Sequence, residues 1–116
     1  MAIACDDLFA AYSHGYHLGA QGLGGFEGAP SIQAWAAELG RTDAGARRLH
    51  RSATQLAAWA ECCEAYARRA RGESREACSS EQPHVVFAVH LAERDAEAGR
   101  LRSPLELGAV LRQLGV

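Results

Sequence analysis

The sequence predicts an all-α protein: a compact, single-domain bundle of about five helices with one long central helix, spanning residues 1–116. Apolar residues recur at intervals of three and four along most of the chain, which is the spacing of one helix face. Glycines, prolines and capping residues divide these segments into about five. Hydrophobic residues make up 48% of the 116, enough for a packed core in one domain.

The first helix is expected to follow Asp6 or Asp7, because either carboxylate can cap it. Its apolar residues are Leu8, Phe9, Tyr12, Tyr16 and Leu18. Gly15 and Gly19 lie four apart, which weakens the helix but permits a close approach by a neighbour. Residues 22–30 hold four of the chain's glycines besides a proline, so a loop is expected there.

A short helix is expected to begin at Ser31 and to end at Gly40, since glycine commonly terminates helices. Thr42 is then a suitable N-cap for the longest helix, which is expected to reach about Arg71. A heptad seam runs along this long helix and consists of Leu49, Ala53, Leu56, Ala60, Cys63, Ala67 and Ala70. Trp59 and Tyr66 flank that seam, and the pattern leaves open whether they are buried.

Residues 72–82 are polar and are expected to form a loop. Pro83 suits the first turn of a helix that Gly99 would end, although residues 85–89 are rich in valine and leave a strand as an alternative. Ser103 and Glu106 form the pattern of a capping box at the start of the last helix. No internal repeat is apparent from the sequence.

Charge and cysteine content limit the class of protein. The formal net charge is -2, so no overall positive field draws the chain to nucleic acid or membrane. The four cysteines include an adjacent pair in a helical segment, which is typical of reduced thiols in a cytoplasmic protein. The first residues lack the pattern of a signal peptide, and no apolar run has the length of a membrane span.

Catalytic, cofactor and metal motifs are not found. The sequence has no GxSxG, GxxxxGK or HExxH, so an enzyme is not expected. His14 and His17 share a helix face, and Cys62 and Cys63 are thiol ligands in principle. Adjacent cysteines on a helix point about 100° apart and rarely bind one ion together. We therefore expect neither a metal nor a cofactor.

Residues 32–51 combine a small residue at Ala36, a glycine at Gly40 and leucines at Leu39 and Leu49. This segment resembles the helix-turn-helix of bacterial transcription regulators. The resemblance implies that residues 42–51 form a recognition helix. In that case the side chains that reach DNA are Arg47, Arg48 and Arg51. An ordinary helical hairpin with a solvated arginine face is the alternative.

The function that we expect is a non-enzymatic protein-binding module that occludes or recruits a macromolecular partner. Small helical chains without motifs often act in this way, including phage-encoded inhibitors of host defence such as anti-CRISPR proteins. The candidate partner-binding residues are Phe26, Trp35, Trp59 and Tyr66 with Arg47, Arg48, Arg51, Arg68 and Arg69. For at least two of the four aromatic residues, core packing is the favoured alternative. A helix-turn-helix regulator remains the other function, and a homodimer is possible.

Overall fold

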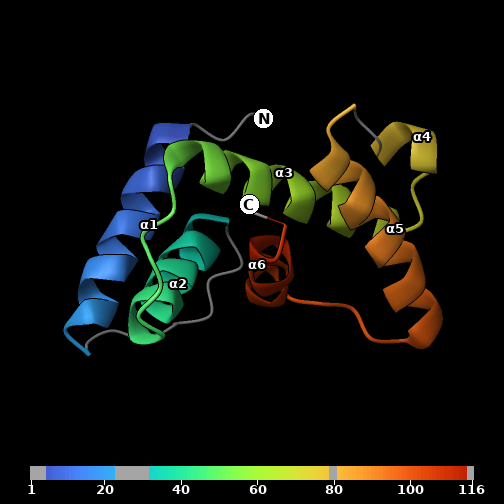
Figure 1. Ribbon diagram of the computed structural model, residues 1–116. Helices are drawn as coiled ribbons and strands as arrows, with labels where there is room; N and C mark the ends of the chain where they lie inside the picture. The colour runs from blue at the N-terminus through green and yellow to red at the C-terminus, as the bar shows by residue number, and fades with distance from the viewer. Residues whose placement is uncertain (1–4, 23–31, 79–80, 115–116) are drawn as a thin grey trace. The chain divides into compact units, whose positions relative to one another are not determined.

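The computed structural model describes residues 5–22, 32–78 and 81–114 and confirms the all-α prediction. The described helices are α1 (Cys5–Ala20), α2 (Ile32–Gly45), α3 (Ala53–Ala70), α4 (Arg75–Cys78), α5 (Pro83–Ala98) and α6 (Pro104–Arg112), as Figure 1 shows. None of them is both long enough and apolar enough to cross a membrane. The loop expected at residues 22–30 lies almost entirely outside the described residues.

The chain divides into two compact units, Met1–Ala57 and Ala58–Val116, and the division falls inside α3. Unit 1 therefore contains α1, α2 and the start of α3. Unit 2 contains the rest of α3 with α4, α5 and α6. Each unit has its own buried residues. The expected single domain stays a prediction.

Unit 1 is built on a close crossing of α1 and α2, which lie side by side in Figure 1. A Cβ atom added at Gly15 would overlap the backbone of Ala37, and one at Gly40 would overlap the backbone of Tyr12. A Cβ at Gly19 would lie 2.7 Å from the Cα of Arg41. The glycines therefore let the two backbones touch, as the spacing of Gly15 and Gly19 predicted.

The expected helix boundaries at residues 40–52 are wrong. Helix α2 continues through Gly40 to Gly45, because Gly40 serves the crossing with α1 and is not a terminator. Thr42 consequently lies inside α2 and caps nothing. The helix expected to run from 42 to 71 is instead interrupted, and α3 begins at Ala53.

The buried face of α3 differs from the expected heptad seam. Leu56 and Cys63 are buried as predicted, but Ala53 and Ala67 are exposed and Leu49 lies outside the helix. The buried positions of this helix are Leu56, Trp59, Cys62, Cys63, Ala65 and Tyr66. The two large aromatic side chains cover more apolar area than alanine, so they turn inward and set the face that packs.

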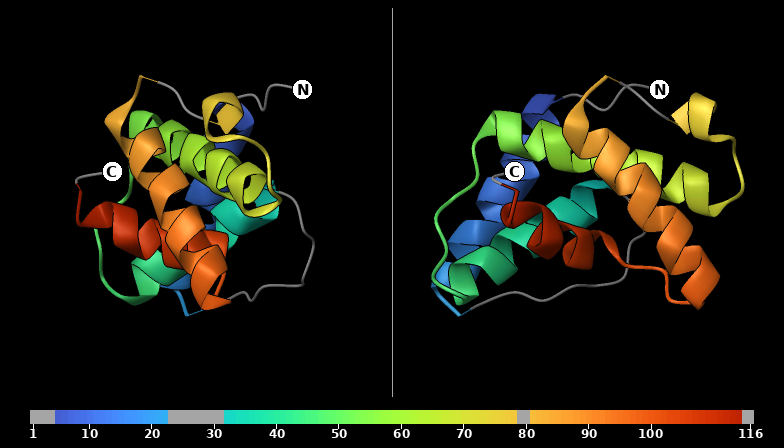
Figure 2. Two further views of the ribbon diagram at one scale, coloured as in Figure 1. Left: turned by 90° about the vertical axis from the view of Figure 1, so that its right-hand side faces the viewer. Right: turned by 45° about the vertical axis from the view of Figure 1, so that its right-hand side comes forward.

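Unit 2 resolves the choice between helix and strand at residues 85–89, because α5 includes all five. Pro83 stands at its start and Gly99 ends it in the left-handed conformation with φ 70°, both as predicted. A buried cluster joins four small or branched residues, namely Ala65, Cys78, Val85 and Val89. The views in Figure 2 show α5 crossing the C-terminal part of α3. Where the structure describes the expected loop at 72–82, which is at all but residues 79–80, it contains a short helix, α4.

Helix α6 begins with the capping box that the sequence predicted. The Ser103 hydroxyl accepts from the Glu106 amide, and the Glu106 side chain accepts from the Ser103 amide. Leu107 and Leu111 are buried on its inner face. The indole of Trp59 donates to the carbonyl oxygen of Pro104 at 2.9 Å, which ties α3 to the start of α6 within unit 2.

Candidate functional site

Unit 1 contains a buried hydrogen-bond network of three residues. The Tyr12 hydroxyl donates to Asp43 Oδ2 at 2.6 Å, and Arg51 Nε donates to the same oxygen at 2.8 Å. The backbone amide of Arg51 in turn donates to the Tyr12 hydroxyl at 3.1 Å. Asp43 is fully buried and Arg51 is 2% exposed. Burial and the hydrogen bond to Asp43 raise the pKa of Tyr12, so its proton is firmly held.

Unit 2 repeats this network with three other residues. The Tyr66 hydroxyl donates to Asp95 Oδ2 at 2.7 Å, and Arg102 Nε donates to the same oxygen at 2.9 Å. The backbone amide of Arg102 donates to the Tyr66 hydroxyl at 2.7 Å. Burial is the main cause that raises the pKa of Tyr66 to about 12. The same three residue types thus make the same three hydrogen bonds in both units.

The sequence around the two networks also matches. Asp43-Ala44-Gly45-Ala46 corresponds to Asp95-Ala96-Glu97-Ala98, and one residue later each segment continues with Arg-Leu and then with Arg-Ser. The only difference in length is His50, which stands between Leu49 and Arg51 and has no counterpart in unit 2. The expectation that the chain has no internal repeat is therefore corrected: it contains a helical unit twice.

The segment after each aspartate also has the same backbone hydrogen bonds. Arg47 adopts a left-handed conformation with φ 59°, and Gly99 does so with φ 70° at the matching position. The next amide reaches back to the aspartate carbonyl in each unit, from Arg48 at 2.8 Å and from Arg100 at 2.9 Å. We call residues 46–52 connector 1 and residues 99–103 connector 2.

Both connectors end on a serine capping box. The Ser52 amide donates to Gln55 Oε1 at 2.8 Å, and the Gln55 amide donates to the Ser52 hydroxyl at 3.1 Å. Ser103 and Glu106 do the same in unit 2. Each connector is therefore fixed at its start by a left-handed turn, at its arginine by the buried network, and at its end by a helix cap.

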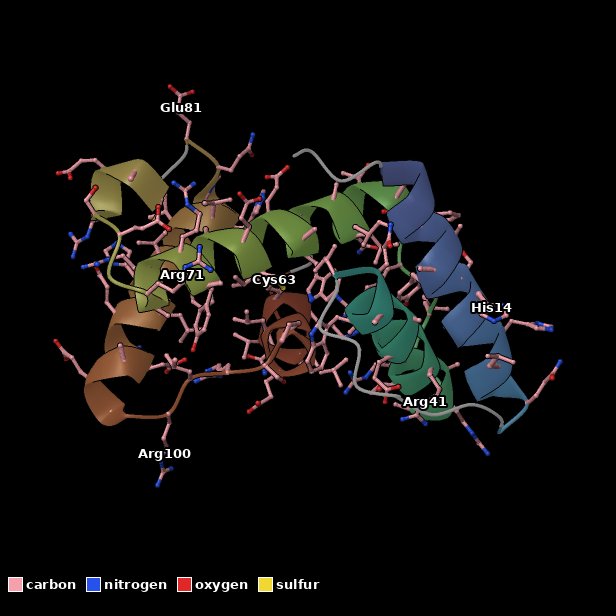
Figure 3. The ribbon with its side chains drawn as sticks, turned by 180° about the vertical axis from the view of Figure 1, so that it is seen from behind. His14, Arg41, Cys63, Arg71, Glu81 and Arg100 are labelled. Atoms are coloured by element: carbon pink, nitrogen blue, oxygen red, sulfur yellow. The ribbon has the colours of Figure 1, made fainter. Side chains whose placement is uncertain are left out.

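Each connector presents a leucine to solvent. Leu49 is 85% exposed and Leu101 is 57% exposed, and they occupy matching positions. Arg47 precedes Leu49 by two residues and Arg100 precedes Leu101 by one; both arginines are exposed, and neither side chain makes an ion pair or hydrogen bond to a described residue. Figure 3 shows the Arg100 side chain extending away from the ribbon. Each connector thus has an exposed leucine and, shortly before it in the sequence, an exposed arginine without an ion-pair partner among the described residues.

The predicted aromatic anchors are placed differently. Trp59 is fully buried and Tyr66 is 3% exposed, so both are core residues of unit 2 and their expected role on the surface is wrong. This agrees with the core packing favoured for at least two of the four aromatic residues. Trp35 is half-buried on α2, at the position that Phe87 occupies on α5. Phe26 lies outside the described residues.

The arginines expected to contact DNA do not lie on one helix. Residues 42–45 end α2, and Arg47, Arg48 and Arg51 belong to connector 1. Arg48 is partly exposed, and its Nη1 lies 3.8 Å from Asp43 Oδ1. Arg51 is buried in the network, where its guanidinium is committed to Asp43. Of the three, Arg47 alone is both exposed and without a partner among the described residues.

Arg68 and Arg69 are paired with carboxylates of unit 2. Arg68 lies 3.1 Å from Glu73, and Arg69 lies 3.0 Å from Glu93. Arg75 also reaches Glu93 at 2.9 Å, and the two arginines lower the pKa of Glu93 to about 2. These cations are therefore largely neutralised within the protein, and they form a weaker candidate for partner binding than the connector arginines.

The thiols and histidines whose side chains the structure describes are not arranged to bind a metal. Cys62, Cys63 and Cys78 are buried, and burial raises the pKa of the Cys62 thiol to about 12. That thiol therefore stays protonated at neutral pH and is a poor nucleophile. Among residues 8–22, 32–78 and 81–114, no three His, Cys, Asp or Glu side chains gather as metal ligands.

The connectors could not be recognised from the sequence, because the networks that fix them join distant residues. Tyrosine and aspartate are separated by 31 positions in unit 1 and by 29 in unit 2. The signal that could have found them is the pair of segments from aspartate to serine. In comparisons with known proteins, no family model, curated protein or solved structure matches the chain.

Proposed function

We propose that the protein is a non-enzymatic binding module that docks a protein partner through connectors 1 and 2. The observation that carries the proposal is the exposure of Leu49 and Leu101 at matching positions of the two units. A single exposed leucine is ordinary on a protein surface. Two at the same position of a repeated unit, each on a fixed connector, are better explained by contact with a partner.

Arg47 supports the same proposal through its backbone. A residue other than glycine in the left-handed conformation costs about 1 kcal/mol, and unit 2 has glycine at this position. The Arg47 side chain makes no hydrogen bond or ion pair with a described residue that would offset this cost. Backbone strain that is kept at an exposed position favours a functional role for the side chain.

The chemistry of the connectors supports a protein partner. Leucine and arginine together fit an acidic protein surface with an apolar pocket, where the leucine is buried and the arginine forms an ion pair at the rim. Nucleic acid offers phosphates to the arginines but no pocket for the leucines, and the chain as a whole is negative. If the protein is an inhibitor of host defence of the anti-CRISPR type, the partner is a protein of that defence. This expectation stays a prediction.

Position-specific photo-crosslinking is the first test. A photoreactive amino acid is placed at Leu49, at Leu101, or at the exposed control position Ala109 on α6, and each protein is irradiated in a lysate of the source cells. We expect positions 49 and 101 to capture the same protein and position 109 to capture none of it. Capture of nucleic acid at 49, or equal capture at all three positions, would overturn the proposal.

The affinity of variants for the captured partner, measured together with their stability, then distinguishes an effect on docking from an effect on folding. We expect Arg47→Gly to weaken binding by about tenfold while it stabilises the free protein by about 1 kcal/mol, because glycine relieves the left-handed strain. The control variant is Arg94→Ala, which removes another exposed cation, on α5. Alanine is used there because glycine would weaken the helix. We expect this variant to bind the partner normally. Calorimetric titration and urea unfolding measure the two effects. Unchanged affinity of Arg47→Gly and of Leu49→Ser would contradict docking at connector 1.

A further inference from the structure

Comparison of the two units separates what the shared network needs from what unit 1 adds. Ser13 follows Tyr12 on α1, whereas Ala67 follows Tyr66 on α3. Connector 1 contains His50, for which connector 2 has no counterpart. Both residues are therefore dispensable for the repeated hydrogen bonds, yet in unit 1 they contact each other.

The contact has the geometry of a nucleophile and its base. Ser13 Oγ lies 2.9 Å from His50 Nε2, and His50 Nδ1 lies 2.7 Å from the carbonyl oxygen of Arg51. A carbonyl oxygen only accepts hydrogen bonds, so Nδ1 carries the proton and Nε2 presents its lone pair. Ser13 Oγ–H then donates to Nε2. A hydroxyl, an imidazole and an orienting acceptor in this order make up the arrangement that activates serine.

The imidazole is held in place from several sides. The ring centroids of Phe9, Tyr12 and Tyr16 lie 5.3, 4.8 and 5.0 Å from that of His50. The carbonyl that orients Nδ1 belongs to Arg51, whose amide and guanidinium are fixed by the buried network. The Tyr16 hydroxyl donates to the carbonyl of Arg48 at 2.6 Å and secures the connector on the other side of His50. The base is thus preorganised by residues that do not react.

The pair is also accessible. His50 is exposed and Ser13 is half-buried, so a small reagent can reach the hydroxyl. The neighbouring rings of Phe9 and Tyr16 offer an apolar surface suited to an aryl or acyl group. Ser13 differs in this respect from Cys62, whose thiol is enclosed and protonated.

We propose that Ser13 is an activated nucleophile, with His50 as its general base, that accepts an acyl group from activated carboxylic esters. Ser13 Oγ attacks the ester carbonyl carbon while His50 Nε2 takes the hydroxyl proton. The bond from the carbonyl to the leaving oxygen breaks, and that oxygen leaves with the proton from His50. The products are acyl-Ser13 and an alcohol or phenol, so no oxidant, reductant or metal takes part. This reaction does not require a bound partner, although its base, His50, belongs to connector 1.

The test uses the full chain with two probes, p-nitrophenyl acetate and a fluorophosphonate, which forms a stable adduct on activated serines. Intact mass spectrometry and peptide mapping locate the adduct. The variants are Ser13→Ala, which introduces the residue of unit 2, and His50→Gln. His14→Gln, a change of an exposed histidine on the same helix, is the matched control.

We expect one adduct, on Ser13, that is lost in Ser13→Ala and forms about 100-fold more slowly in His50→Gln, the size of a general-base contribution. His14→Gln should react as the parent protein does. Unfolding midpoints are measured for all variants, so that loss of labelling in a folded Ser13→Ala protein is informative. The proposal is overturned when the parent protein forms no adduct with either probe, or when His50→Gln is labelled at the parental rate.

Discussion

Replacement of Asp43 by alanine is expected to lower the free energy of unfolding by about 3–5 kcal/mol, more than any other single change proposed for this protein. The carboxylate is fully buried and accepts hydrogen bonds from Tyr12 and Arg51. Its removal takes away the buried carboxylate to which Arg51 Nε donates, and the Arg51 side chain is itself buried. Urea unfolding followed by circular dichroism measures the loss.

Asp95→Ala is the matched comparison, because it removes the same group from the network of unit 2. There the Asp95 side chain is 12% exposed and the Arg102 side chain 35% exposed, so water partly replaces the lost partner. We expect a smaller loss, about 1–2 kcal/mol. Glu97→Ala, at an exposed position of α5, should change stability by less than about 0.5 kcal/mol. An Asp43→Ala protein as stable as Glu97→Ala would contradict the buried network.

Replacement of Gly40 by alanine is expected to destabilise the protein by about 3 kcal/mol, at the upper end of the usual cost of overpacking. The new Cβ would overlap the carbonyl oxygen of Tyr12 and lie 2.7 Å from the Tyr16 amide nitrogen. Both neighbours are backbone atoms of α1, so neither can rotate away. The two helices would have to separate, which also loosens the contact between Tyr12 and Asp43. Thermal and urea unfolding give the measurement.

Gly45→Ala provides the control on the same helix. A Cβ at Gly45 meets nothing within 4 Å, and the position is exposed. Alanine there should stabilise the protein by about 0.5–1 kcal/mol, since it restricts the unfolded chain and favours the helix. The two glycines are therefore expected to respond with opposite signs. Destabilisation of equal size at both positions would contradict a tight crossing of α1 and α2.

The parts of the fold that the sequence predicted well depend on local signals. The bounds of α5 follow from Pro83 and Gly99, and the start of α6 follows from the capping box of Ser103 and Glu106. Each signal acts within one helical turn, so it can be recognised without knowledge of the rest of the chain. The close approach at Gly15 was predictable for a similar reason, because small residues four apart lie on the same helix face and leave room there for a neighbouring backbone.

The errors around residues 40–52 have a non-local cause. Gly40 is a helix terminator by local preference, but contact with α1 keeps it inside α2. Likewise, Leu49 fits the heptad pattern in the sequence, but it lies after the end of α2 and before the start of α3. In both cases tertiary contacts decide the outcome, and propensity alone points the other way.

The candidate site was less predictable than the fold. Large aromatic side chains such as Trp59 suit both a core and an interface, and only burial distinguishes the two. The role of Arg51 depends on Tyr12, which lies 39 residues earlier in the chain. The repeat itself was obscured by His50, since one additional residue shifts the two segments out of register.

The same tyrosine–aspartate–arginine network fixes each connector, and the docking that we propose for the connectors depends on it. Amide hydrogen exchange of Arg51 and Arg102, measured by NMR in the parent protein and in Tyr12→Phe and Tyr66→Phe, tests the network directly, because each amide donates to its tyrosine hydroxyl. We expect both amides to be protected in the parent protein. Tyr12→Phe should speed exchange at Arg51 alone, and Tyr66→Phe at Arg102 alone, each by about tenfold or more. Unprotected amides in the parent protein, or exchange that neither variant changes, would contradict the shared network.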